Sequence, residues 1–259
     1  MNESWIYRLD AGLLCVLTGF AMMLAAAAGA WLARLRPQLA ESRLGPIETS
    51  LFGLLALLLA FSFSGAASRY EARSNLMVDT ANALQGAILR ADLYPEPLRA
   101  EIRTDLRDYL DAQIAFHEGE GDATQREGAI AQGEAAAQRL WGRVSEAARN
   151  PALGLASTQN IAALDRLFAL THSRQVAART HTPVAILWLL FVLALATAYT
   201  SAYAAGSTGK FSWAGYVGYA VLTALVIYIT LDLDQPGRGL IRRDVQEQAF
   251  LALRPLLAN

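Results

Sequence analysis

The sequence predicts an all-α membrane protein, with four transmembrane helices and a helical domain outside the bilayer. Four stretches contain no Asp, Glu, Lys or Arg, and they cover residues 11–33, 49–68, 182–209 and 211–231. About 20 helical residues cross a hydrocarbon core about 30 Å thick, and each stretch is that long. No strand-like alternation of polar and apolar residues occurs, so the class is all-α.

The first apolar stretch predicts a transmembrane helix over residues 11–33. Residues 1–10 hold Glu3 and Asp10 beside one basic residue, Arg8, whereas a signal peptide begins with positive charge and has a shorter apolar part. We therefore interpret the stretch as a retained helix. Cys15 lies within it as the single cysteine of the chain, and one cysteine forms neither an internal disulfide nor a metal site.

The second transmembrane helix is predicted over residues 48–68, and it continues as a long rod to about residue 91. Beyond the membrane, apolar residues such as Met77, Leu84 and Ile88 recur at helical intervals. Two prolines after residue 94 end the rod, because proline removes a backbone donor and restricts the residue before it.

Residues 69–181 are predicted to form a helical cytoplasmic domain. A helix with an apolar stripe follows the two prolines, and its other face is charged. Residues 119–128 predict a loop and residues 129–149 a further helix. Ser157 or Thr158 is the expected cap of the last helix before the membrane.

Residues 182–206 and 211–231 predict the third and fourth transmembrane helices, and residues 232–259 a cytoplasmic C-terminal segment. Four spans place both termini and the helical domain on one side, and an excess of basic residues marks the cytoplasmic side. Arg8, Arg69, Arg73, Arg174, Arg179, Arg238, Arg242 and Arg243 lie on that side, against Arg34, Arg36, Arg43 and Lys210. With Lys210 the single lysine among 22 basic residues, we expect a multi-pass protein of a bacterial inner membrane.

Residues for enzymatic or coupled-transport chemistry are missing from the apolar stretches. No charged residue lies within these stretches, and the first acidic residues, Asp232 and Asp234, come only at the end of the fourth helix. The lack of charge inside the membrane argues against a proton-coupled transporter or a voltage sensor. His117, His172 and His181 have no metal-ligand spacing and are interpreted as surface residues. We predict no enzyme activity, cofactor or metal, and a net charge of −1 gives no support for a nucleic-acid partner.

Asp232 and Asp234 are nevertheless a candidate cation contact, because carboxylate oxygens bind hard cations. The alternative is a polar helix end before Gln235, Pro236 and Gly237. We favour the polar helix end.

Two stripes of residues spaced by four run along the second transmembrane helix. One consists of small side chains that let helices approach closely, namely Ala56, Ala60, Ser64 and Ser68. The other is the predicted pore lining, namely Gly53, Leu57, Phe61 and Gly65. If several copies surround an axis, its bulky members form hydrophobic rings, and such constrictions gate pores by dewetting.

Three segments carry a resemblance to a known family. Residues 60–73 resemble the second-helix region of bestrophins, with Arg69-Tyr70 in place of an Arg-Trp pair and Arg73 one residue early. A fuller match is to the prokaryotic bestrophin-like family, which is similar at residues 69–73, 89–97 and 231–242. The motif residues in those segments are Arg69, Tyr70, Arg73, Arg90 and Asp92.

The resemblance implies a homo-oligomer, by analogy a pentamer, that conducts inorganic ions across the lipid bilayer. Bestrophins are anion channels whose second helix lines a hydrophobic neck, so anions are slightly favoured. Counting back from Arg69, the neck positions fall on Phe61, Leu57 and Gly53, and Gly53 departs from the bulky pattern. The acidic calcium clasp of animal bestrophins has no match, so calcium gating is not implied. The alternative function is a non-conducting membrane scaffold or signalling protein that binds a partner through its helical domain.

Overall fold

The computed structural model describes residues 11–35, 44–119, 123–178, 180–207, 212–234 and 244–257. Within those ranges all regular structure is helical, which confirms the predicted all-α class. The chain divides into a membrane unit, Met1–Tyr70 with His181–Gln235, and a bundle unit, Glu71–Thr180 with Pro236–Asn259. One uninterrupted helix, α2, contributes its first part to the membrane unit and its second part to the bundle unit.

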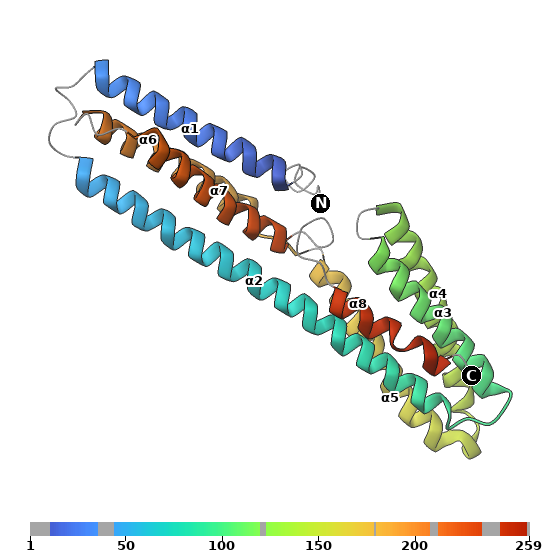
Figure 1. Cartoon of the computed structure of the whole chain (residues 1–259). Helices are drawn as coiled ribbons and strands as arrows, with labels where there is room; N and C mark the ends of the chain where they lie inside the picture. The colour runs from blue at the N-terminus through green and yellow to red at the C-terminus, as the bar shows by residue number, and fades with distance from the viewer. Residues whose placement is uncertain are drawn as a thin grey trace. The chain divides into compact units, whose positions relative to one another are not determined.

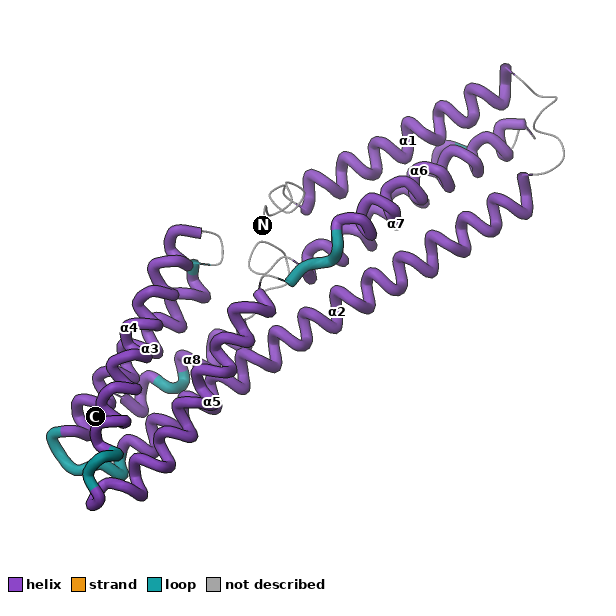
Figure 2. The backbone as a smooth tube through the Cα atoms, turned by 180° about the vertical axis from the view of Figure 1, so that it is seen from behind, coloured by secondary structure: helices purple, strands orange, loops and turns teal. Residues whose placement is uncertain are grey.

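The membrane unit contains four helices that are long and apolar enough to cross a bilayer, as the sequence predicted. Figures 1 and 2 show these helices running along one another within the unit. They are α1 (Ala11–Leu35), the first part of α2 (Leu44–Ala91), α6 (Val184–Ser207) and α7 (Trp213–Asp234).

Small residues let α1 and α6 approach closely. A Cβ added at Gly29 of α1 would lie well inside contact distance of the backbone carbonyl of Tyr199 in α6. A Cβ added at Gly206 of α6 would come 3.0 Å from the Cβ of Ala33 and 3.2 Å from the Cα of Ala30. Lipid provides little hydrophobic drive for helices to associate, so such close van der Waals packing holds the pair together.

The membrane part of α2 is less covered by its own chain than the other three helices. In the 18-residue apolar window of each helix, the share of residues buried by the chain is 17% for α2, 28% for α1 and 33% for both α6 and α7. Leu55 reaches the core that α1, α6 and α7 share, whereas Leu57 and Phe61 are 53% and 67% exposed. The predicted small-residue stripe of α2 is likewise exposed in the single chain. Lipid or further copies of the chain must therefore cover this face.

The bundle unit consists of the second part of α2, three long helices and a C-terminal helix around one core. The long helices are α3 (Leu98–Glu118), α4 (Ala123–Ala147) and α5 (Gly154–Ala178), and the short elements are η3 (Pro151–Leu153), α8 (Asp244–Leu251) and η4 (Arg254–Leu257). The largest fully buried side chains of the core are Met77, Leu84, Ile88, Tyr94, Ile102, Leu106, Leu110, Leu140, Leu164, Leu167 and Phe250.

Two helix starts in the bundle unit differ from the sequence prediction. α4 begins at Ala123 and not at residue 129, because a single glycine in a helix costs only about 1 kcal/mol relative to alanine. α5 begins at Gly154, directly after a turn that the Asn150 side chain caps by accepting a hydrogen bond from the Ala152 N–H at 3.0 Å. Ser157 is buried 3.3 Å from the Tyr94 hydroxyl, so it joins the core contacts and does not cap the helix.

The C-terminal helix belongs to the bundle unit and packs on a buried arginine. The Arg174 guanidinium lies 5.3 Å from the ring centroid of Phe116 and 5.2 Å from that of Phe250. It also donates a hydrogen bond to the Gln113 side-chain oxygen. Aromatic faces attract a cation most strongly when water is excluded, and Arg174 is 5% exposed.

Candidate functional site

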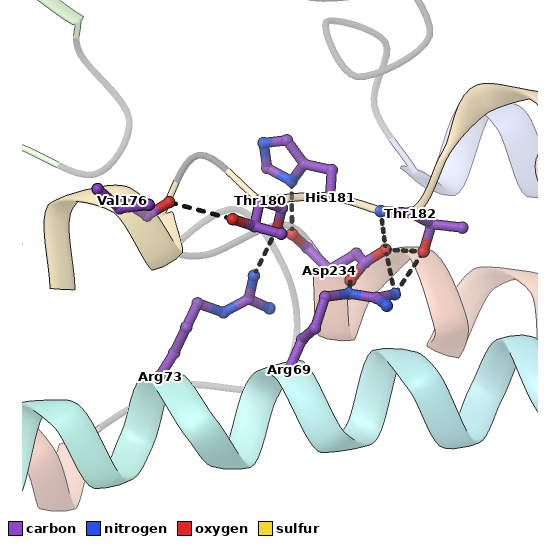
Figure 3. A network of polar contacts seen from close by, with 7 residues as sticks. All are labelled: Arg69, Arg73, Val176, Thr180, His181, Thr182 and Asp234. Atoms are coloured by element: carbon purple, nitrogen blue, oxygen red, sulfur yellow. Dashed lines mark hydrogen bonds and ion pairs between the residues drawn. The ribbon is translucent and has the colours of Figure 1, made fainter. Parts of the chain in front are cut away.

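Arg69 on α2 and Asp234 at the end of α7 form a two-pronged ion pair within the membrane unit (Figure 3). Arg69 Nε donates to Asp234 Oδ1 at 2.8 Å, and Arg69 Nη2 donates to Oδ2 at 3.0 Å. The side chain of Asp234 is 1% exposed and that of Arg69 is 26% exposed. A guanidinium that grips both carboxylate oxygens is a strong and directional contact, so the pair fixes α2 against α7.

Thr182, in the segment before α6, satisfies the rest of the Asp234 carboxylate. Its backbone N–H donates to Oδ2 at 3.0 Å, and its hydroxyl donates to the same oxygen. Arg69 Nη2 donates to the Thr182 hydroxyl, and His181 Nδ1 lies 3.2 Å from the backbone oxygen of Asp234. α2, α7 and the segment before α6 therefore converge on one carboxylate, as Figure 3 shows.

Arg73 lies one turn after Arg69 on α2 and is buried in the bundle unit. It is 3% exposed, and its Nη1 donates to the backbone oxygen of Thr180 at 3.4 Å (Figure 3). The Thr180 hydroxyl in turn donates to the Val176 carbonyl at 3.2 Å. Tyr70, between the two arginines, is half-buried. Both guanidinium groups are thus directed at partners on other segments of their own units.

The two aspartates proposed as a cation contact are both buried at the end of α7. Both oxygens of Asp234 accept hydrogen bonds from Arg69 or Thr182, so the Arg69 guanidinium supplies the positive charge beside it. Asp232 is 6% exposed. Across the described part of the chain, no group of three or more His, Cys, Asp and Glu residues is placed to hold a metal ion. A cation contact at this pair stays a prediction.

The four residues predicted to line a pore have different surroundings. Leu57 and Phe61 are exposed, and a Cβ added at Gly53 would meet nothing within 4 Å. Gly65 is half-buried, and a Cβ there would come 3.3 Å from Arg69 Nη1. Gly65 therefore leaves room for the Arg69 side chain, whereas the other three positions form an uncovered face. Pore lining by these residues stays a prediction.

The other motif residues hold the corner that follows α2 in the bundle unit. The backbone oxygen of Arg90 accepts a hydrogen bond from Asn160 Nδ2 at 2.9 Å, and its own Nη1 donates to the Gly86 carbonyl at 2.8 Å. Asp92 Oδ1 accepts from Arg103 Nη1 at 2.8 Å. These contacts indicate a structural role for this part of the motif. The stretch 235–242 of the third motif segment lies outside the described residues, as do Arg8, Arg36, Arg43, Arg179, Lys210 and Arg243 of the orientation count.

Sequence reasoning did not assign a role to Thr182 or His181, which meet Asp234 in the structure. Thr182 was only the first residue of an apolar stretch, and His181, interpreted as a surface residue, is half-buried. One sequence feature could have predicted this contact. Thr182 begins the third apolar stretch and Asp234 follows the fourth, and the start of one helix lies beside the end of the next when the two run antiparallel. Arg69, which donates to the Thr182 hydroxyl, lies 113 residues from Thr182, and local periodicity carries no information over that distance.

Comparison with known proteins agrees with the fold. A family model of the Bestrophin-like domain matches residues 15–250 of the chain, whereas no curated protein matches it. A variant of a bacterial Bestrophin homologue from Klebsiella pneumoniae is 14% identical, with a TM-score of 0.70 over 96% of this chain and 99% of that chain.

A second structure of the Klebsiella pneumoniae homologue is also 14% identical, with a TM-score of 0.67 over 94% of this chain and 95% of that one. At such identities the likeness shows a shared fold. The family match, in contrast, covers most of the sequence and includes the membrane helices and Arg69, Asp234 and Thr182. The chain therefore belongs to the Bestrophin-like family.

Proposed function

We propose that the protein is a homo-oligomeric ion channel whose conduit is lined by the membrane part of α2. The observation that carries this proposal is the uncovered face of α2. Among the described residues, nothing would lie within 4 Å of a Cβ added at Gly53, and Leu57 and Phe61 are 53% and 67% exposed. α1, α6 and α7 pack on one another, and several copies arranged around an axis would bring the α2 faces together. The bestrophin resemblance supports the same arrangement.

In this arrangement Leu57 and Phe61 would form hydrophobic rings. Phe61 is 67% exposed in the single chain, so its ring is free to extend towards an axis. A ring of bulky apolar side chains lets water and ions pass only when it is wide enough to stay wet. Gly53 has no side chain to narrow the next ring, so the constriction is centred on Leu57 and Phe61.

The Arg69–Asp234 pair would hold each α2 in place at the end of the constriction. Arg69 lies two turns beyond Phe61, and its fork on Asp234 ties α2 to α7 of the same chain. A shift of α2 about its axis would have to break this pair. The pair therefore supports a fixed orientation of the ring-forming side chains.

The family resemblance slightly favours anions as the conducted ions. The alternative function, a non-conducting scaffold, uses only the bundle unit and needs no ring of subunits. Subunit number separates the two functions, because one or two copies cannot enclose a conduit with α2.

The test is ion flux through liposomes that contain the purified protein, together with its mass in detergent. We expect an assembly of more than two copies and a flux above that of empty vesicles. Phe61→Ala should raise the flux by widening the ring, and Leu222→Ala, on the exposed face of α7, should leave it unchanged. A monomer or dimer, or a flux that matches empty vesicles for both the natural protein and Phe61→Ala, would contradict the proposal.

A further inference from the structure

A cavity of about 170 Å³ lies within the bundle unit, between α3, α4 and α5. All of its lining residues belong to that unit. An apolar cavity of about 150 Å³ holds one benzene molecule, so this cavity has room for a ligand of about that size.

Aromatic rings form a large part of the cavity wall. They belong to Tyr109 and Phe116 on α3 and to Phe168 on α5. The ring centroids of Tyr109 and Phe168 lie 5.9 Å apart, and the two rings are tilted by 55°. Aromatic rings attract one another in tilted and edge-to-face arrangements, so this wall favours a ligand that brings a further aromatic ring.

The Tyr109 hydroxyl gives the cavity a buried hydrogen-bond acceptor. Thr171 Oγ1 donates its single proton to the Leu167 carbonyl at 2.9 Å. The Tyr109 hydroxyl lies 2.7 Å from Thr171 Oγ1, so Tyr109 is the donor in that contact. Burial raises the pKa of Tyr109, and the hydroxyl therefore keeps this proton at neutral pH. Its oxygen can then accept a hydrogen bond from a ligand.

The Gln113 amide gives the same cavity a buried donor. Arg174 donates to the Gln113 side-chain oxygen, and an arginine has no acceptor, so this contact fixes which branch of the amide is oxygen. Gln113 Nε2 is the other branch and would lie 3.5 Å from a Cβ added at Gly133, which also lines the cavity. A ligand oxygen beside Gly133 could accept a hydrogen bond from Nε2.

Charges of both signs lie close to the cavity and disfavour a charged ligand. Glu134 lines it on the exposed side, and the Arg174 guanidinium is 5.3 Å from the ring centroid of Phe116 in its wall. A cation would be repelled by Arg174 and an anion by Glu134, and either would lose its hydration on entry. A neutral ligand avoids these costs.

We propose that the cavity is a binding site for a small neutral aromatic alcohol. The ring of the ligand packs against Tyr109 and Phe168. Tyr109 and Gln113 lie four residues apart on α3 and therefore on the same face of that helix. One hydroxyl group both donates and accepts, so it can meet the Tyr109 oxygen and the Gln113 amide together. This inference does not depend on the proposed channel function.

The test is fluorine NMR of para-fluorobenzyl alcohol, titrated with the full-length protein in detergent. We expect saturable line broadening on binding. Para-fluorotoluene lacks the hydroxyl, para-fluorobenzylamine is a cation and para-fluorobenzoate is an anion. Each of these should bind about fivefold more weakly than the alcohol, or less, since each loses at least the equivalent of one hydrogen bond.

Two glycines of α4 provide a matched pair of variants. In Gly133→Ala the new methyl group would lie 3.5 Å from Gln113 Nε2 and 3.6 Å from the Ala112 Cβ, which are ordinary contacts, and it would take up part of the cavity. This variant should bind the alcohol about tenfold more weakly, because one extra methyl group overpacks the occupied site. In Gly142→Ala the methyl group would meet nothing within 4 Å, and binding should be unchanged. Alanine favours the helix, so neither variant should unfold at a lower temperature.

Tyr109→Phe keeps the aromatic ring and removes the acceptor, so it should bind the alcohol and para-fluorotoluene with similar affinity. Equal affinity of Gly133→Ala and Gly142→Ala for the alcohol would overturn the inference, because the probe would then be held by detergent or by another surface. Tighter binding of the amine or the benzoate than of the alcohol, or no saturable broadening at all, would overturn it as well. None of these results bears on the channel.

Discussion

Arg69 and Asp234 lie 165 residues apart in the sequence and are joined by hydrogen bonds of 2.8 and 3.0 Å. The pair connects α2 to the end of α7 within the membrane unit. This contact matters because α2 shares little core with the other helices. Thr182 adds two further hydrogen bonds to the same carboxylate. The carboxylate is thus satisfied although its side chain is 1% exposed.

Replacement of Asp234 by alanine should destabilise the protein strongly. The Arg69 guanidinium and the Thr182 N–H would lose their shared acceptor in a site with little water, and loss of one partner of a buried pair costs about 3–5 kcal/mol. Thermal unfolding in detergent measures the effect. In an Arg69→Ala background, Asp234→Ala should lower stability by less, because no Arg69 charge is then left without its carboxylate.

The matched control is the surface pair Arg99–Glu96, whose side chains are 40% and 54% exposed. Solvent screens such a pair, so Glu96→Ala should change stability by less than about 1 kcal/mol. Equal effects of Asp234→Ala and Glu96→Ala would show that the buried pair does not hold α2.

Gly29→Ala should separate α1 from α6. The added methyl group would meet the Tyr199 backbone, which has no side-chain freedom with which to move away. We expect a lower unfolding temperature in detergent, by the equivalent of about 1–3 kcal/mol of overpacking. Gly218→Ala, on α7, is the control, because its Cβ would meet nothing within 4 Å and alanine favours the helix. An unfolding temperature that Gly29→Ala does not lower would contradict the close packing.

Phe250→Ala should loosen the C-terminal helix from the bundle unit. Phe250 is 1% exposed and stacks on Arg174, and truncation of a buried phenylalanine costs about 3–5 kcal/mol. Limited proteolysis should then cleave the C-terminal segment faster than in the natural protein. Leu251, the next residue, is 36% exposed, so Leu251→Ala should leave the cleavage rate nearly unchanged. Similar cleavage of the two variants would rule out docking through Phe250.

Features of the fold that depend on nearby residues could be predicted from the sequence. The four membrane-capable helices follow from apolar stretches of sufficient length, because a charged residue in lipid is costly. The continuation of α2 to Ala91 follows from helical periodicity and from the prolines after Tyr94. Leu57 and Phe61 could be placed on a common face of α2 for the same reason, and both are exposed.

Features that join distant segments could not be predicted in this way. The ion pair of Arg69 with Asp234 depends on the packing of α2 and α7, and neither residue differs locally from an ordinary charged residue at the end of an apolar stretch. Docking of α8 through Phe250 was missed because one short apolar segment has no period that identifies its partner. Gly65 was placed in the pore stripe by spacing alone, whereas the Arg69 side chain fills the space beside it.

Access of water to Leu57 shows whether α2 lines an ion conduit. In a Cys15→Ala background, Leu57→Cys places a single thiol on the uncovered face of α2, and Leu222→Cys places one on the exposed face of α7. A charged thiol reagent that does not cross membranes is added to liposomes during ion flux. We predict that it modifies Leu57→Cys and reduces the flux, while Leu222→Cys, surrounded by lipid, stays unmodified. An unreactive Leu57→Cys in a protein that conducts ions would show that α2 does not line the conduit.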